Sequence, residues 1–437
     1  MMTSSDRGLP CEWIFRSATS CQRGLGDLVT HRGTLGDVVV DDLTPHDWAV
    51  WREGRSPEPR SSSRACNGTQ ADMSGLPGSV RTMTERNETA PTGPTEASSR
   101  GLGMSQLSPL LFPSVDEIRA NRARLGDLVI TTPVRVVTDD ALVAAVGGST
   151  RVWLKEELFQ RTGSFKPRGA LSVMLDLDAG ALARGVTGVS AGNHAISLAY
   201  SARILGTTAK VVMPETANRF RVKLCEDLGG LIEFVGNVHQ AFDRAEEIAA
   251  VEGRSFVHPF EGPKTALGTA SVGMEFVEQV RDAGASLDAV IVAVGGGGLS
   301  GGVACAVKQM VPTARVYAVE PEGADSLSRS FRTGSPEAID AVRTIADSLG
   351  APRCEPYSFE LNRRFVDDVV LVTDGQIREA MRVLFRSAKL VSEPAGAAAL
   401  AALMYPLHGR LDGMNVGIVV CGANIDPESF ARYILPG

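Results

Sequence analysis

Short apolar runs alternate with longer segments of helical periodicity through the second half of the chain. The predicted strands cover 186–189, 209–213, 231–235 and 289–294, and the predicted helices between them cover 195–205, 217–228 and 238–251. This alternation is typical of parallel sheets whose strands are joined by crossover helices. The fully apolar run 289–294 predicts a strand that is covered on both faces. We therefore expect an α/β protein.

Two further elements are predicted upstream. Ser114 and Glu117 have the spacing of a capping box, which predicts a helix that continues toward Arg124. Residues 151–156 predict a strand that leads into a polar turn near Gly163.

The first 104 residues lack this pattern. Ser, Thr, Gly, Pro and Arg dominate 52–103, and sustained amphipathic periodicity is missing. We expect residues 1–104 to be a low-complexity, disordered extension, in which 25–30 and 35–41 are weak strand candidates.

Composition excludes several classes of protein. The net charge of −7 and pI near 5.6 give no electrostatic reason to bind nucleic acid. No stretch approaches the ~20 apolar residues of a membrane span, and the N-terminus lacks the pattern of a secretory signal. The 7 cysteines have no CxxC spacing, which favours a reducing, cytoplasmic compartment.

The segment 163–170 reads GSFKPRGA, with Lys166 between an aromatic residue and a proline. Proline favours the first turn of a helix, so one interpretation is a surface lysine in a helix-initiating loop. The second interpretation is a reactive amine, because a buried lysine loses its charge readily and forms Schiff bases with carbonyl groups. An aldehyde cofactor with a phosphate arm would explain Lys166 together with two glycine-containing turns.

The first turn, Ser190-Ala191-Gly192-Asn193-His194, joins a strand to a helix and has the composition of an anion-binding corner. Alternatively, Ser190 or Asn193 is an ordinary helix N-cap. The second turn is Gly295-Gly296-Gly297-Gly298, followed by Leu299 and a helix through Met310. Glycines let backbone amides close around a phosphate, and the helix N-terminus adds a favourable dipole.

The second turn also supports a rival hypothesis. Gly296, Gly298 and Gly301 spell GxGxxG, and Glu320 ends a predicted strand about twenty residues later, as in a dinucleotide-binding fingerprint. That hypothesis leaves Lys166 and the SAGNH turn unexplained, so we prefer the aldehyde cofactor.

The GSFKPRGA segment resembles the cofactor-lysine motif of fold-type II pyridoxal-phosphate enzymes, in the group of threonine/serine dehydratases and serine racemases. The resemblance runs from about Pro109 to the C-terminus and includes the EPAGA motif at 393–397 and the CGAN turn at 421–424. It implies a two-domain fold like that of the tryptophan synthase β subunit. Residues 105–186 and 262–437 would form the large cofactor-binding domain, and 187–261 a small domain that closes over the substrate.

The resemblance also assigns roles to residues. Lys166 would hold the cofactor and act as the general base, Asn193 would bind the ring hydroxyl, and Cys421 would face the ring nitrogen. The cofactor-binding residues would be Phe165, Lys166, Asn193, Gly295, Gly296, Gly297, Gly298, Leu299, Glu393 and Cys421. The substrate would contact Ser190, Ala191, Gly192 and His194.

The segment after Glu320 is similar to the metal-binding segment of serine racemases, with Glu320, Ala324 and Ser326 at the ligand positions. Two carboxylates and a backbone carbonyl suit a hard cation. Serine replaces the family's third, acidic ligand here, so a divalent and a monovalent cation are both left open.

The function that the resemblance implies is an ammonia-lyase that converts L-threonine to 2-oxobutanoate, L-serine to pyruvate, or both, with release of ammonia. Serine racemases have a serine where this chain has Ala191, which has no proton to give, so racemisation is the weaker hypothesis. Two more hypotheses are a lyase for 3-hydroxyaspartate or another β-hydroxy amino acid, and a non-catalytic pyridoxal-phosphate carrier. We expect a small-molecule amino acid substrate and a homo-oligomer, either a dimer or a tetramer.

Overall fold

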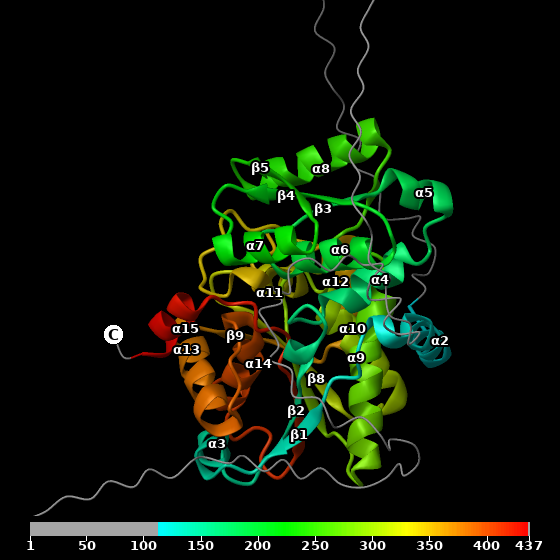
Figure 1. The fold of residues 1–437 in the computed structure, drawn as a ribbon. Helices are drawn as coiled ribbons and strands as arrows, with labels where there is room; N and C mark the ends of the chain where they lie inside the picture. The colour runs from blue at the N-terminus through cyan, green and yellow to red at the C-terminus, as the bar shows by residue number, and fades with distance from the viewer. Residues whose placement is uncertain (1–111, 436–437) are drawn as a thin grey trace, which may run out of the picture. The chain divides into compact units, whose positions relative to one another are not determined.

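The computed structural model describes residues 112–435. The extension predicted over 1–104, with its two strand candidates, lies outside the described residues. Figure 1 shows two groups of strands in the described part, each flanked by helices.

A six-stranded sheet has the order β1-β2-β10-β7-β8-β9. Its strands are β1 (Val134–Val137), β2 (Arg151–Lys155), β7 (Ala289–Ala293), β8 (Arg315–Pro321), β9 (Asp368–Val372) and β10 (Asn415–Val419). All neighbours are parallel except the antiparallel pair β1 and β2. Every residue of β7 is buried, as its fully apolar sequence predicts for a central strand covered on both faces.

Helices cover both faces of this sheet (Figure 1). One face carries α9 (Pro263–Asp282) and α10 (Gly298–Met310), and the opposite face carries α13 (Asp374–Val383) and α14 (Pro394–Met404). All residues of α14 are buried, and its alanines and glycine let it approach the strands closely.

A four-stranded parallel sheet has the order β5-β4-β3-β6. Its strands are β3 (Val186–Val189), β4 (Ala209–Pro214), β5 (Leu231–Val235) and β6 (Ser255–Phe256). Helix α8 (Val238–Glu252) packs on one face, and α6 (Asn193–Ile204) and α7 (Arg219–Asp227) pack on the opposite face (Figure 1).

Shorter elements complete the described chain. These are α2 (Val115–Leu125), η2 (Gly126–Leu128), α3 (Asp140–Ala145), η3 (Glu157–Phe159), α4 (Lys166–Met174), α5 (Ala179–Arg184), α11 (Ser326–Thr333), η4 (Asp347–Leu349), α12 (Pro356–Phe365), the π-helical η5 (Leu384–Ala388) and α15 (Pro427–Ile434). Helix α2 begins with the predicted capping box, in which the side chains of Ser114 and Glu117 each accept from the backbone N–H of the partner residue. No helix among the described residues is long and apolar enough to cross a membrane.

The α/β prediction is confirmed. Strands β3 and β5 have the predicted bounds, whereas α6 begins at Asn193, two residues earlier than expected. The first turn of α6 therefore contains Asn193 and His194 of the SAGNH turn. The domain boundaries at 186/187 and 261/262 stay a prediction.

Candidate active site

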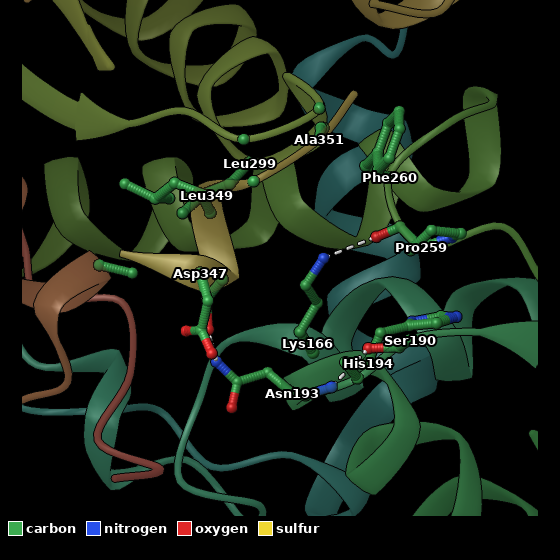
Figure 2. A pocket seen from close by; sticks show the side chains of 18 of the residues that line it. Lys166, Ser190, Asn193, His194, Pro259, Phe260, Leu299, Asp347, Leu349 and Ala351 are labelled. Atoms are coloured by element: carbon green, nitrogen blue, oxygen red, sulfur yellow. Dashed lines mark hydrogen bonds between the residues drawn. The ribbon is translucent and has the colours of Figure 1, made fainter. Parts of the chain in front are cut away.

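One pocket gathers the residues that the sequence predicts for the cofactor and the substrate (Figure 2). Most of its chemistry lies just beyond the carboxyl ends of parallel strands: 190–194 after β3, 295–299 after β7, and Cys421 after β10. Ligands of α/β proteins bind at this end of the strands. Lys166, Phe165 and Glu393 line the same pocket, so the structure brings all predicted cofactor residues together.

Lys166 is the first residue of α4, and its side chain points into the pocket (Figure 2). Its Nζ donates to the carbonyl oxygen of Pro259 at 2.7 Å and lies 5.1 Å from the ring centre of Phe165. Burial lowers the pKa of Lys166 to about 8, and the electrostatic interactions with Cys421 and Glu393 oppose this shift without cancelling it. A much larger fraction of this amine is uncharged near neutral pH than for an exposed lysine, as a nucleophile requires.

The loop 295–299 forms a cradle of backbone amides at the N-terminus of α10. In the described part of the chain, the N–H groups of these five residues donate no hydrogen bond to another residue. Gly297 has φ of 88°, which favours glycine, and a Cβ at Gly296 would lie 2.2 Å from the Phe260 ring. Unpaired amides at a helix N-terminus suit a phosphate group.

Asn193 is held on both sides of its amide. Its Nδ2 donates to Oε1 of Glu393 at 2.6 Å, and its Oδ1 accepts from Nδ2 of Asn424 at 2.7 Å. Ser348 donates to Oε2 of Glu393 at 3.2 Å. Burial raises the pKa of Glu393, and the Arg221 charge opposes that rise. This network fixes the orientation of the Asn193 side chain at the pocket wall.

Arg221, on α7, belongs to the site although no sequence motif marks it. Its Nη1 donates to Asp347 at 2.6 Å, its Nη2 to Glu393 at 3.1 Å, and its Nε to the carbonyl oxygen of Asn424 at 2.8 Å. One guanidinium thus joins the helices of the four-stranded sheet to segments around the six-stranded sheet. A single arginine in an amphipathic helix gives no sequence signal for this role.

His194 is not arranged as a general acid. Its Nε2 lies 2.9 Å from the carbonyl oxygen of Val257, and burial, followed by the nearby Lys166 charge, lowers its pKa to about 3. The imidazole is therefore neutral near pH 7. Ser190, which also lines the pocket, accepts the N–H of Gly192 at 3.0 Å through its Oγ.

Cys421 is buried at the pocket wall. Burial, reinforced by the charge of Glu393, raises the pKa of its thiol far above the ordinary value. The group that it presents to a ligand is thus a neutral thiol. Ser164, near the lysine in sequence, carries a buried hydroxyl with no hydrogen-bond partner in the described structure.

The cation site predicted at Glu320, Ala324 and Ser326 finds no support. Each oxygen of the Glu320 carboxylate accepts a backbone hydrogen bond, Oε1 from the N–H of Leu327 and Oε2 from that of Ser328, both at 2.8 Å. Glu320 therefore holds the start of α11, and burial raises its pKa to about 8. Over the described residues, no group of three or more His, Cys, Asp or Glu side chains could hold a metal.

A buried ionic network surrounds Arg168, two residues after Lys166 in the GSFKPRGA segment, and nothing in the sequence indicates the partners of this arginine. Arg168 donates to Glu157 through Nε and Nη2, both at 2.8 Å, and to Glu275 through Nη1 at 2.9 Å and Nη2 at 2.8 Å. Lys155 also donates to Glu275, at 2.9 Å. Burial opposes ionisation of Glu275, yet Arg168 and Lys155 together lower its pKa to about 2. The network ties the start of α4 to β2 and α9.

A low-pKa amine, an amide cradle, an oriented carboxamide and a neutral thiol face one pocket. This donor set fits pyridoxal phosphate: an amine for its aldehyde, amides for its phosphate, and Asn193 and Cys421 for its ring. It fits a dinucleotide less well, because a dinucleotide would leave the Lys166 amine without a role.

Comparison with known proteins agrees with this fit. Residues 127–422 match the family model of pyridoxal-phosphate dependent enzymes. A phenylserine dehydratase of Ralstonia pickettii is 50% identical over 331 residues, which cover 76% of this chain and 99% of that protein. An L-threonine ammonia-lyase of Thermotoga maritima is 35% identical over 325 residues, which cover 74% of this chain and 79% of that protein.

The solved structure of maize serine racemase matches with a TM-score of 0.68 at 32% identity, covering 73% of this chain and 95% of that one. The resemblance inferred from the sequence is confirmed. The chain belongs to the fold-type II pyridoxal-phosphate dependent enzymes, in a group whose members include dehydratases and racemases.

Proposed function

We propose that the protein is an ammonia-lyase that dehydrates a β-hydroxy α-amino acid to a 2-oxo acid and ammonia. The observation that carries this proposal is the placement of the low-pKa Lys166 amine in one pocket with the amide cradle 295–299. The substrates predicted from the sequence are L-threonine and L-serine. The 50% identity to a phenylserine dehydratase adds a β-aryl amino acid as a second substrate class.

Bound pyridoxal phosphate would supply the electron sink that makes the Cα proton of an amino acid acidic. Lys166 would hold the cofactor aldehyde and, after displacement by the substrate amine, accept the Cα proton. The amides of 295–299 would hold the phosphate, and Asn193 the ring hydroxyl. The N-terminus of α6, with Ser190, would hold the substrate carboxylate, as helix N-termini hold anions.

Cys421 would determine whether the ring nitrogen of the bound cofactor is protonated. A neutral thiol does not keep the ring nitrogen protonated as a carboxylate does, which favours rapid loss of a β-leaving group. Lys166 would take the Cα proton, and the β-hydroxyl group would leave as water when the Cβ–O bond breaks. The remaining enamine hydrolyses to the 2-oxo acid and ammonia.

Racemisation needs a proton donor on the face of Cα opposite Lys166. At the position that resembles the racemase serine, Ala191 presents a methyl group, and His194, which lines the same pocket, is neutral. A non-catalytic cofactor carrier is disfavoured because Lys166, Asn193, the amide cradle and Cys421 all line the pocket.

The test is turnover of L-threonine, L-serine and L-threo-phenylserine by the purified protein loaded with pyridoxal phosphate, measured as 2-oxo acid formed. We expect turnover of at least one substrate, and borohydride should fix the cofactor to Lys166, as located by peptide mass spectrometry. Lys166→Ala should abolish both results. Lys308→Ala, which removes a partly buried lysine that is paired with Asp367 and does not line the pocket, should leave both unchanged. Absence of 2-oxo acid with every substrate would refute the proposal.

We further propose that the enzyme is cytoplasmic and forms a dimer or tetramer. The four cysteines of the described chain, Cys225, Cys305, Cys354 and Cys421, are free and buried, which supports a reducing compartment. Light scattering after size-exclusion chromatography would measure the oligomeric state.

A further inference from the structure

One wall of the pocket is apolar, and none of the proposed catalytic roles uses it. Val238 and Phe242 lie on the first two turns of α8, four residues apart and therefore on one helix face, and both line the pocket. Leu349, at the end of η4, and Pro352, just after it, line the pocket as well. This wall is built from two segments of the chain that are distant in sequence.

The Phe242 ring is held in place by its neighbours. The His258 ring centre lies 5.7 Å from that of Phe242, and the Phe260 ring meets His258 edge-on at 4.6 Å. The Arg353 guanidinium carbon lies 5.6 Å from the Phe242 ring centre. A ring packed in this way is a preformed surface for a second aromatic group, because little side-chain freedom is lost on binding.

His258 contributes no charge to this wall. Its Nδ1 accepts the N–H of Phe260 at 3.3 Å and that of Glu261 at 3.0 Å, which fixes the ring orientation. Burial, followed by the Lys166 and Arg353 charges, lowers its pKa to about 3. The three packed rings of Phe242, His258 and Phe260 are therefore all uncharged near pH 7.

The basic residues of the pocket already have partners or roles, because Lys166 is assigned to the cofactor and Arg221 is ion-paired. Lys166 and Arg221 are the only lysine and arginine among the described lining residues, and Arg221 is paired with Asp347 and Glu393. Arg353, which contacts the Phe242 ring from outside this lining, is paired with Glu355 at 2.6 Å. A carboxylate on the substrate side chain would thus find no unpaired cation among the lining residues, and its burial would be costly. The pocket thus disfavours an acidic substrate such as 3-hydroxyaspartate.

We propose that Val238, Phe242 and Pro352 form a subsite for an aryl group on Cβ of the substrate. The enzyme is thereby specific for β-aryl β-hydroxy amino acids over those with a small or an acidic β-substituent. This inference rests on the proposed lyase function and names the substrate class of the same site. Phe242 is its central specificity-determining residue.

The kinetic test compares L-threo-phenylserine with L-threonine, which undergo the same reaction and carry a phenyl or a methyl group on Cβ. We expect kcat/KM for phenylserine to exceed that for threonine by at least about 10-fold, in line with discrimination by apolar pockets. Phe242→Ala should lower kcat/KM for phenylserine by about 10- to 100-fold and change that for threonine less than about 3-fold. Phe242→Leu, which keeps apolar volume without a ring, should give an intermediate loss.

Phe234→Ala is the matched control, because Phe234 is a partly exposed aromatic residue of β5 that does not line the pocket. It should leave the phenylserine-to-threonine ratio unchanged. The subsite proposal is refuted if Phe242→Ala lowers kcat/KM for both substrates equally, or if threonine or 3-hydroxyaspartate has the highest kcat/KM. Neither result would contradict the lyase function.

A binding measurement separates the subsite from turnover. L-Phenylalanine and L-alanine carry no β-hydroxyl group and cannot lose water, so calorimetric titration of the loaded enzyme reports their affinities. We expect L-phenylalanine to bind at least about 10-fold more tightly than L-alanine, and Phe242→Ala or Val238→Ala to reduce that ratio. Equal affinities in the unmodified enzyme would overturn the subsite, even if the enzyme proves to be a lyase. Selective binding of L-phenylalanine without any 2-oxo acid would overturn the lyase function alone.

Discussion

Replacement of Arg168 by methionine tests how the helix that carries Lys166 is anchored. Methionine keeps much of the side-chain volume but leaves Glu157 and Glu275 buried without their shared cation. Glu275 retains Lys155, whereas Glu157 retains the Thr132 hydroxyl, at 2.5 Å. Breaking a buried ion pair on one side costs about 3–5 kcal/mol, because the remaining charge is uncompensated.

The expected size of the effect in a melting experiment follows from the entropy of unfolding. At ~2.1 cal/mol/K per residue over roughly 320 residues, each kcal/mol lowers the apparent Tm by about 1.5 °C, so the loss should be about 4–7 °C. Differential scanning fluorimetry of the cofactor-loaded protein measures this shift. Arg363→Met is the control, since its pair with Glu360 is on the surface and contributes less than about 1 kcal/mol.

Adding Glu157→Gln to Arg168→Met should recover part of the lost stability, because the glutamine side chain brings no buried charge. An Arg168→Met protein that melts within about 1 °C of the Arg363→Met control would refute the reasoning. In that case the ionic network would be stabilising neither α4 nor its contacts with α9.

Two predictions concern the chemistry of the site. Ala191→Ser should raise the amount of D-serine formed from L-serine relative to pyruvate, because the new hydroxyl group can donate a proton where Ala191 has only a methyl group. Chiral chromatography measures the two products. If the unmodified enzyme formed D-serine as fast as pyruvate, the role assigned to Ala191 would be contradicted. Since burial lowers the Lys166 pKa to about 8, the uncharged amine accumulates as pH rises through 8 and not through the usual value near 10.5. The rate at which borohydride-fixable cofactor forms on the apoprotein should thus rise with pH and level off just above pH 8, and a rise that continues to pH 10 would show an ordinary lysine.

The parts of this structure that depend on local sequence could be predicted. Strand β3 and the turn after it follow from a β-branched run that ends in small polar residues, and the capping box of α2 is formed by residues three positions apart. Helix α9 was not predicted, although Pro263 at its first turn and its amphipathic periodicity are signals that could have found it.

The parts that depend on distant residues could not be predicted. Arg221 donates a hydrogen bond to Glu393, which is 172 positions away in the sequence, and Arg168 donates one to Glu275, which is 107 positions away. Periodicity shows which side of a helix is buried, but it does not show which charge that side will meet. Phe242 likewise reads as a core residue of α8, and only the fold shows that it lines the pocket.

The contact between the amide cradle and Phe260 limits how this enzyme can change over evolutionary time. The space that a Cβ would take at Gly298 is filled by the backbone carbonyl of Phe260, 2.3 Å away, and at Gly296 by the ring of the same residue. A smaller side chain at position 260 would make room for a Cβ at Gly296, whereas no change of the side chain at 260 makes room at Gly298, where the obstacle is backbone. In a laboratory library, side chains at position 296 should therefore survive mainly together with a smaller residue at 260, whereas position 298 should remain glycine whatever residue stands at 260.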